Sequence, residues 1–168
     1  MPTWSILHQG LPLTGQGNQD LLALPMTAFF ASRQCPGIAI RAAMDWALQQ
    51  ASAKHTVVSG FHSPLEQSVL KVLMAAGSPA VAVLARPVQG AKLPQEWTEP
   101  LAKGQMAVVS GVATAGRLTQ QLAVERNALA AQLAQKIVVA HASPDGSLAE
   151  QLGQWRHEGR QVNVLLAT

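Results

Sequence analysis

Several short apolar runs in this sequence end on polar side chains, and some of these side chains are suited to binding an anion. Ser32 and Arg33 directly follow one run, while Arg126 and Asn127 lie between apolar positions of a predicted helix. A guanidinium group binds phosphate through several N–H donors in one plane. Backbone N–H groups at a helix N-terminus add to such a site. The pattern therefore favours a phosphate-bearing ligand.

Two serine-led segments predict helix N-termini. Ser63 with Glu66 fits a capping box, and Ser147 with Glu150 fits a second one. Capping alone accounts for these side chains, but the free N–H groups at either helix start can also hold a phosphate. Gly146, just before the second segment, allows a backbone to approach a ligand closely.

Other polar residues follow the predicted strands at the same edge. His62 could stack on or hydrogen-bond a ligand, or it could be a packed loop histidine. Arg126 could reach a ligand phosphate, or it could pair with Glu125 or Glu66, because a buried arginine needs a partner. The candidate ligand-binding residues are Ser32, Arg33, Ser59, Gly60, His62, Ser63, Glu66, Ser110, Arg126, Asn127, His141, Gly146 and Ser147.

The sequence shows no pattern typical of a metal, cofactor or catalytic site. Its five histidines are scattered, and it has neither an H-E-x-x-H segment nor a phosphate-binding G-x-x-x-x-G-K-[ST] or G-x-G-x-x-G loop. Cys35 is the single cysteine, so an internal disulfide is excluded. We expect no catalytic residue, no metal and no cofactor, and a binding role rather than an enzymatic one.

Composition limits the partners. The 168 residues are 48% hydrophobic and only 12% charged, with a net charge of +3. This mild basic balance permits a phosphate-bearing partner without demanding one. Few charges suggest burial against a second copy, so a homodimer is expected. No apolar stretch approaches the roughly 20 residues of a membrane span, and no export signal is evident. We therefore expect a cytoplasmic protein without membrane contact.

Alternating strand and helix patterns must position these residues. Strands are predicted at 27–31, 56–59, 80–85, 106–110, 137–140 and 162–166, and helices at 36–51, 64–76, 118–134 and 147–158. Such alternation predicts an α/β three-layer sandwich with a mostly parallel sheet of about six strands. We expect strand order 3-2-1-4-5-6, with a binding crevice between the first and fourth strands. Residues 1–25 should be an irregular leader, and 26–168 one domain.

Four short segments resemble those of the DprA/Smf family of DNA-processing proteins. They are Ser32-Arg33, Val58-Ser59-Gly60, Arg126-Asn127 and Gly146-Ser147-Leu148, in the order of the family's G-S-R, S-G-x-A-x-G-I-D, R-N-R and S-G-S-L. The resemblance covers about residues 26–166 and rests on order and spacing. Glu66 stands where the family has Asp, and Ala128 replaces the second Arg.

This resemblance implies a Rossmann-like core that binds single-stranded DNA, associates with itself and loads a recombinase. It also implies ligand-edge positions for the four matching segments. The wider superfamily includes proteins that act on nucleotide-derived molecules, so a binder or hydrolase of such a small molecule is the alternative. The P-G-G-x-G-T-x-x-E motif of its phosphoribohydrolases is absent, which argues against that reaction.

Overall fold

The computed structural model describes residues 1–165. Its strands are β1 (Trp4–His8), β2 (Leu11–Gly17), β3 (Met26–Phe30), β4 (Thr56–Ser59), β5 (Ala80–Val83), β6 (Met106–Ser110), β7 (Lys136–Val139) and β8 (Val162–Val164). Its α-helices are α1 (Gly37–Ala53), α2 (Pro64–Ala75), α3 (Thr98–Ala102), α4 (Gln120–Leu133) and α5 (Ser147–His157), with 3-10 turns η1 (Gln19–Ala23) and η2 (Gln95–Trp97). The predicted helices are confirmed to within a few residues. The predicted last strand ends earlier, and its residue 166 lies outside the described residues.

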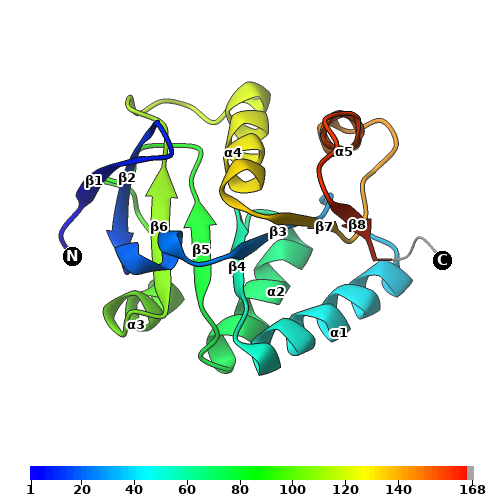
Figure 1. Ribbon diagram of the computed structural model, residues 1–168, viewed down its shortest axis with the longest axis horizontal. Helices are drawn as coiled ribbons and strands as arrows, with labels where there is room; N and C mark the ends of the chain where they lie inside the picture. Colours follow the sequence, from blue (N-terminus) through cyan, green and yellow to red (C-terminus); the bar gives the residue numbers. More distant parts are fainter. Residues whose placement is uncertain (166–168) are drawn as a thin grey trace.

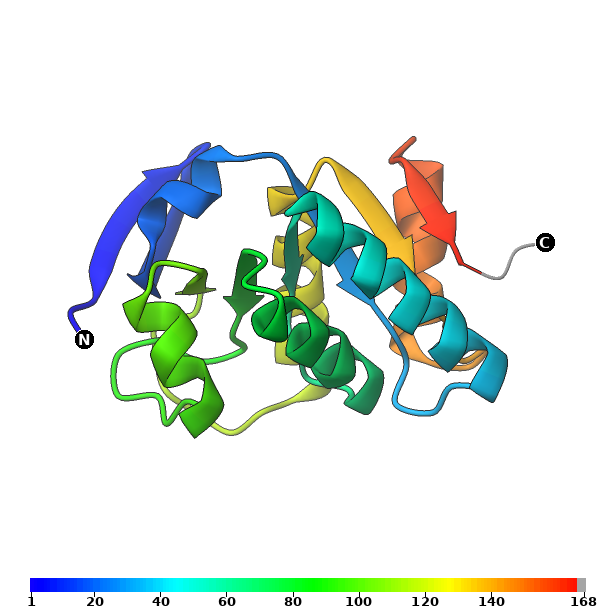
Figure 2. The ribbon, with the colours of Figure 1, turned by 90° about the horizontal axis from the view of Figure 1, so that it is seen from below.

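Helices cover both faces of one open sheet, which confirms the predicted α/β sandwich (Figure 1). Helices α1, α2 and α3 pack on one face, as the view in Figure 2 shows, and α4 and α5 pack on the other. Neighbouring residues of β3 contact the helix layers on opposite faces of the sheet, because side chains alternate along a strand. Phe29 stacks on Trp46 of α1 with ring centroids 5.0 Å apart, and Phe30 stacks on Trp155 of α5 at 4.8 Å.

The predicted strand order is wrong in the position of one strand. The observed order is β1-β2-β6-β5-β4-β3-β7-β8, so β6 pairs with β5 rather than with β3. There is consequently no crevice between the first and fourth predicted strands. The parallel strands β6, β5, β4, β3, β7 and β8 still end at one common edge of the sheet.

The long connection after β5 is the physical reason for this difference. Residues 84–105 contain Trp97 and Leu101, which pack in the same layer as α1 and α2. The β5–β6 connection therefore covers the same face as the β3–β4 and β4–β5 connections, and each new strand adds on the same side. The chain crosses to the opposite face with α4, after β6. The winding direction changes between β3 and β7, and that pair forms the topological switch point.

The expected irregular leader is instead a β-hairpin followed by η1. β1 and β2 pair antiparallel, and β2 then adds to the edge of β6. Gln9 and Gly10 both have positive φ, as a tight two-residue hairpin turn requires. Pro12 is tolerated because β2 contacts β6 only through residues 14–17. Glycine and proline content therefore predicted an irregular segment where a short edge hairpin forms.

Among residues 1–165, we find no helix that combines the length and the apolar character needed to cross a bilayer.

Candidate nucleotide-binding site

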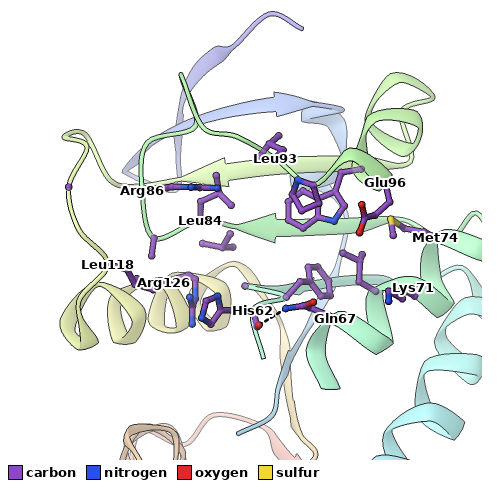
Figure 3. Close-up of a pocket in the computed structure, with 18 residues that line it drawn as sticks. His62, Gln67, Lys71, Met74, Leu84, Arg86, Leu93, Glu96, Leu118 and Arg126 are labelled. Carbon is purple, nitrogen blue, oxygen red and sulfur yellow. Dashed lines mark hydrogen bonds between the residues drawn. The ribbon is translucent and has the colours of Figure 1, made fainter. Parts of the chain in front are cut away.

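A cavity of about 410 Å³ opens at the carboxyl ends of β4 and β5. Helix α2 forms one wall, and the residues after β5 and around η2 form another. Three candidate residues from the sequence line it, namely Gly60, His62 and Arg126. Figure 3 shows His62 and Arg126 side by side at its edge. The binding crevice thus lies beside β4 and β5, and not where the predicted strand order placed it.

Arg126 is the buried cation of this cavity. It lies in the first half of α4 with only 9% of its surface exposed. Its side-chain hydrogen bonds run from Nε and one terminal nitrogen to Oδ1 of the adjacent Asn127, both at 3.4 Å. Within residues 1–165 the one ion pair joins Lys103 to Glu99, so Arg126 has no carboxylate within 4 Å. A buried guanidinium without a carboxylate partner favours binding of an anionic ligand.

Glu66 has a different role from the pairing considered in the sequence. Its Oε2 accepts the Ala31 N–H at 3.0 Å, and its Oε1 accepts the His62 and Ser63 N–H groups at 3.0 and 3.1 Å. The predicted capping box of α2 is confirmed, since Ser63 Oγ accepts the Glu66 N–H. Burial raises the pKa of Glu66, and the three N–H donors and the charge of Arg126 act in the opposite direction. The carboxylate therefore ties the end of β3 to the start of α2.

Gly60 is a close-approach glycine against the arginine. A Cβ at this position would lie 2.5 Å from Nε and 2.8 Å from Cδ of Arg126. The preceding Ser59 is fully buried, and its Oγ accepts the Phe61 N–H at 3.0 Å. Phe61, which lines the cavity, has φ of +46°, a strained value for a bulky residue. This tight turn fixes the cavity floor around Arg126.

Substituting Gly60→Ala should displace Arg126 and weaken its anion binding about tenfold, a loss of about 1.4 kcal/mol. The new methyl group overlaps the middle of the arginine side chain, which must leave its position. Phosphate-ligand titration measures the effect. Gly111→Ala is the matched control, because it follows Ser110 at the end of β6 and the nearest atom to its Cβ would be one of Leu129, at 3.5 Å. Equal losses in both variants would contradict this role of Gly60.

Arg33 adds a second positive charge near the end of β3, and His62 lies within the influence of both Arg33 and Arg126. Burial lowers the pKa of His62, and the positive charges of Arg126 and Arg33 lower it further. These two arginines, from segments far apart in the sequence, therefore both act on the imidazole of His62. Arg33 itself is exposed and does not line the cavity.

A second group of predicted residues gathers at the switch point between β3 and β7. Ser32 Oγ accepts the Ser143 N–H at 2.8 Å, and the Ser32 N–H donates to the His141 carbonyl at 2.9 Å. Gly146 and Ser147 follow in the same loop, at the start of α5. The second predicted capping box is wrong, because Gly146 is the N-cap and no side chain caps this helix. Ser147 instead occupies the first turn.

The remaining candidates lie beside these groups. Ser110, at the end of β6, is buried, and its Oγ accepts the Val112 N–H at 3.0 Å. Ser59 makes the same kind of contact at the end of β4, where its Oγ accepts the Phe61 N–H. Asn127 accepts from Arg126 and donates to Gln151 of α5 at 3.4 Å, so it holds the arginine against the second layer. Ligand contact by either residue stays a prediction.

Sequence reasoning missed several residues of the cavity wall. They are Lys71, one turn after Gln67 on α2, and Glu96 and Trp97 of η2. Arg86 also lines the cavity and donates to the Lys92 carbonyl, and its place after a predicted strand end makes it a candidate for DNA contact from the sequence. The positions of Glu96 and Trp97 depend on the fold of residues 84–97. In the described part of the chain, no cluster of three or more His, Cys, Asp or Glu could hold a metal ion.

The open, mostly parallel sheet with helices on both faces defines a Rossmann-like α/β protein, and its cavity lies at the strand ends. The chain belongs to the DNA recombination-mediator protein A family, which matches residues 5–166. Among curated proteins, no significant relative is found.

Solved structures share this fold. DNA processing protein A from Streptococcus pneumoniae superposes with a TM-score of 0.76 at 20% identity, over 96% of this chain and 61% of that protein. The same protein from Helicobacter pylori, described for its single-stranded DNA binding mode, gives 0.78 at 12% identity, over 98% and 80%. The molybdenum cofactor carrier protein of Chlamydomonas reinhardtii gives 0.55 at 15%, over 82% and 74%. This chain therefore spans less than two thirds of the first relative.

Proposed function

We propose that this chain binds single-stranded DNA at the carboxyl edge of its parallel strands, as a non-enzymatic module of DNA processing. The observation that carries this proposal is the buried guanidinium of Arg126, which faces a cavity and has no carboxylate partner within residues 1–165. Arg33 and Arg86 follow the ends of other strands of the same edge. Membership of the DNA recombination-mediator family supports DNA as the source of the phosphate groups.

The salt dependence of binding tests this proposal. Each phosphate neutralised on a single strand should contribute about −0.7 to the slope of log affinity against log salt concentration. Contacts by Arg33, Arg86 and Arg126 therefore predict a slope of about −2 for a thymine thirty-mer, measured by fluorescence anisotropy. An absent complex at low salt would contradict DNA binding.

A second candidate function is binding of a small nucleotide-derived molecule. The size of the cavity favours it, because 410 Å³ is near the lower end of the range of about 300–1,000 Å³ for small-molecule sites. A tight mononucleotide complex together with no strand binding would support this candidate over DNA.

We further propose self-association and, because the chain belongs to a recombination-mediator family, contact with a recombinase. Ile38 and Leu48 of α1 are exposed by 66% and 59%, and a second copy could cover these apolar side chains. A dimer would also contain two cationic edges. Since one copy has a net charge of only +3, this would add positive charge for contacts with DNA phosphates. Sedimentation at micromolar concentration distinguishes monomer from dimer.

A further inference from the structure

The cavity has one cationic side and one mixed side, which gives its occupant a direction. Arg126 and Arg86 lie at one side, and Glu96 and Lys71 lie at the other (Figure 3). The only ion pair within residues 1–165 is elsewhere, so neither Glu96 nor Lys71 is neutralised by a partner within 4 Å. Both side chains are exposed at the rim. A ligand that spans the cavity and contacts both ends would carry an anion at one end and a hydrogen-bond donor and an acceptor at the other.

The space between these ends is apolar. Phe61, Leu70 and Trp97 are each buried, with exposed fractions of 3%, 2% and 7%, and all three line the cavity. Apolar and aromatic side chains of this kind accept an unstacked nucleobase, and base stacking on an aromatic side chain is sequence-tolerant by itself. The small volume suits one base with its sugar rather than a stack of bases.

The far end determines which base fits. A carboxylate only accepts hydrogen bonds and an ammonium only donates them. The two oxygens of Glu96 can accept from two adjacent donors while Lys71 donates to one acceptor, and the single donor beside an acceptor on adenine or cytosine would leave one carboxylate oxygen unused. Among the four bases, guanine alone has two adjacent donors beside one acceptor, with N1–H and the N2 amino group as donors and O6 as acceptor. Thymine places carbonyl oxygens on both sides of its single N–H, and one of them would face the carboxylate.

We propose that the cavity holds one unpaired guanine nucleotide, with its phosphate at Arg126 and its base edge at Glu96 and Lys71. This inference rests on the proposed function in using Arg126 as the phosphate site, and it adds base selectivity. The nucleotide comes either from a DNA strand or from a free guanine nucleotide, and both present the same chemistry.

Two binding series test the inference. The first compares dGMP with dTMP, and the second compares a thymine thirty-mer with the same strand carrying one internal guanine. A bidentate base contact predicts a preference for guanine of roughly ten- to hundredfold. Glu96→Gln should remove this preference in both series, because the amide no longer offers two acceptor oxygens to the base edge. A preference only among mononucleotides identifies the free nucleotide as the source, and one in the strand series identifies DNA.

Glu99→Gln is the matched control, since Glu99 is an exposed glutamate of the neighbouring helix that lies outside this cavity. Equal binding of guanine and thymine in both series, or a preference that survives Glu96→Gln, would overturn the guanine site. The two proposals fail separately. If Arg126 is needed for the all-thymine strand but no base preference exists, the DNA-binding proposal stands and this inference is wrong.

Discussion

Replacing Arg126 by alanine is expected to weaken binding of a phosphate-bearing ligand roughly ten- to hundredfold. Losing one charged hydrogen-bond partner costs about 1.5–3 kcal/mol, which corresponds to that range of affinity. The guanidinium is buried beside the cavity and its one side-chain partner is the adjacent Asn127, so its removal leaves the cavity without its inner cation. Fluorescence anisotropy with labelled single-stranded DNA measures the change.

A second readout of the same variant is the titration of His62. The charge of Arg126 contributes to the lowered pKa of this imidazole, so Arg126→Ala should raise that pKa toward its ordinary value, as followed by NMR. Arg156→Ala is the control, since Arg156 is an exposed arginine in the last turn of α5. A folded Arg126→Ala protein with unchanged affinity would show that the arginine lies outside the binding site.

Replacing Glu66 by alanine is expected to lower the free energy of unfolding by about 3–5 kcal/mol. Three backbone N–H groups lose their acceptor, and a buried unsatisfied N–H costs about 1–3 kcal/mol, partly recovered by water. The lost bonds join the end of β3 to the start of α2, so the binding edge should loosen as well. Chemical denaturation measures the free energy.

Glu125→Ala controls for the loss of a charge alone, because Glu125 is exposed on α4, where substitutions usually change stability by less than about 0.5 kcal/mol. The pH dependence gives a second check. Because burial raises the pKa of Glu66, the folded state keeps this proton to a higher pH than the unfolded chain. Its contribution to stability is therefore present at low pH and decreases as pH rises toward the raised value. Equal stability of both variants would contradict the proposed tie.

The sequence alone determined the elements and much of their polar chemistry. Apolar runs of strand length, alternating with helical patterns, predicted the parallel strands and the helices between them, because each pattern follows from local burial. The capping box at Ser63 and Glu66 was likewise predicted, since it depends on residues three apart in one segment. The family motifs also indicated Gly60 and Arg126 as residues of the ligand edge, and both line the cavity.

Only the tertiary structure decided which of these residues meet. A strand's neighbours depend on the face that each crossover covers, and the packing of Trp97 and Leu101 in the layer of α2 placed β6 next to β5. That order moved the cavity to the ends of β4 and β5 and added Glu96 to its wall. The hydrogen-bond partner of Arg126 could not be predicted from the sequence either. Glu66 was one candidate, but its oxygens accept backbone N–H groups that lie up to 35 positions away in the chain.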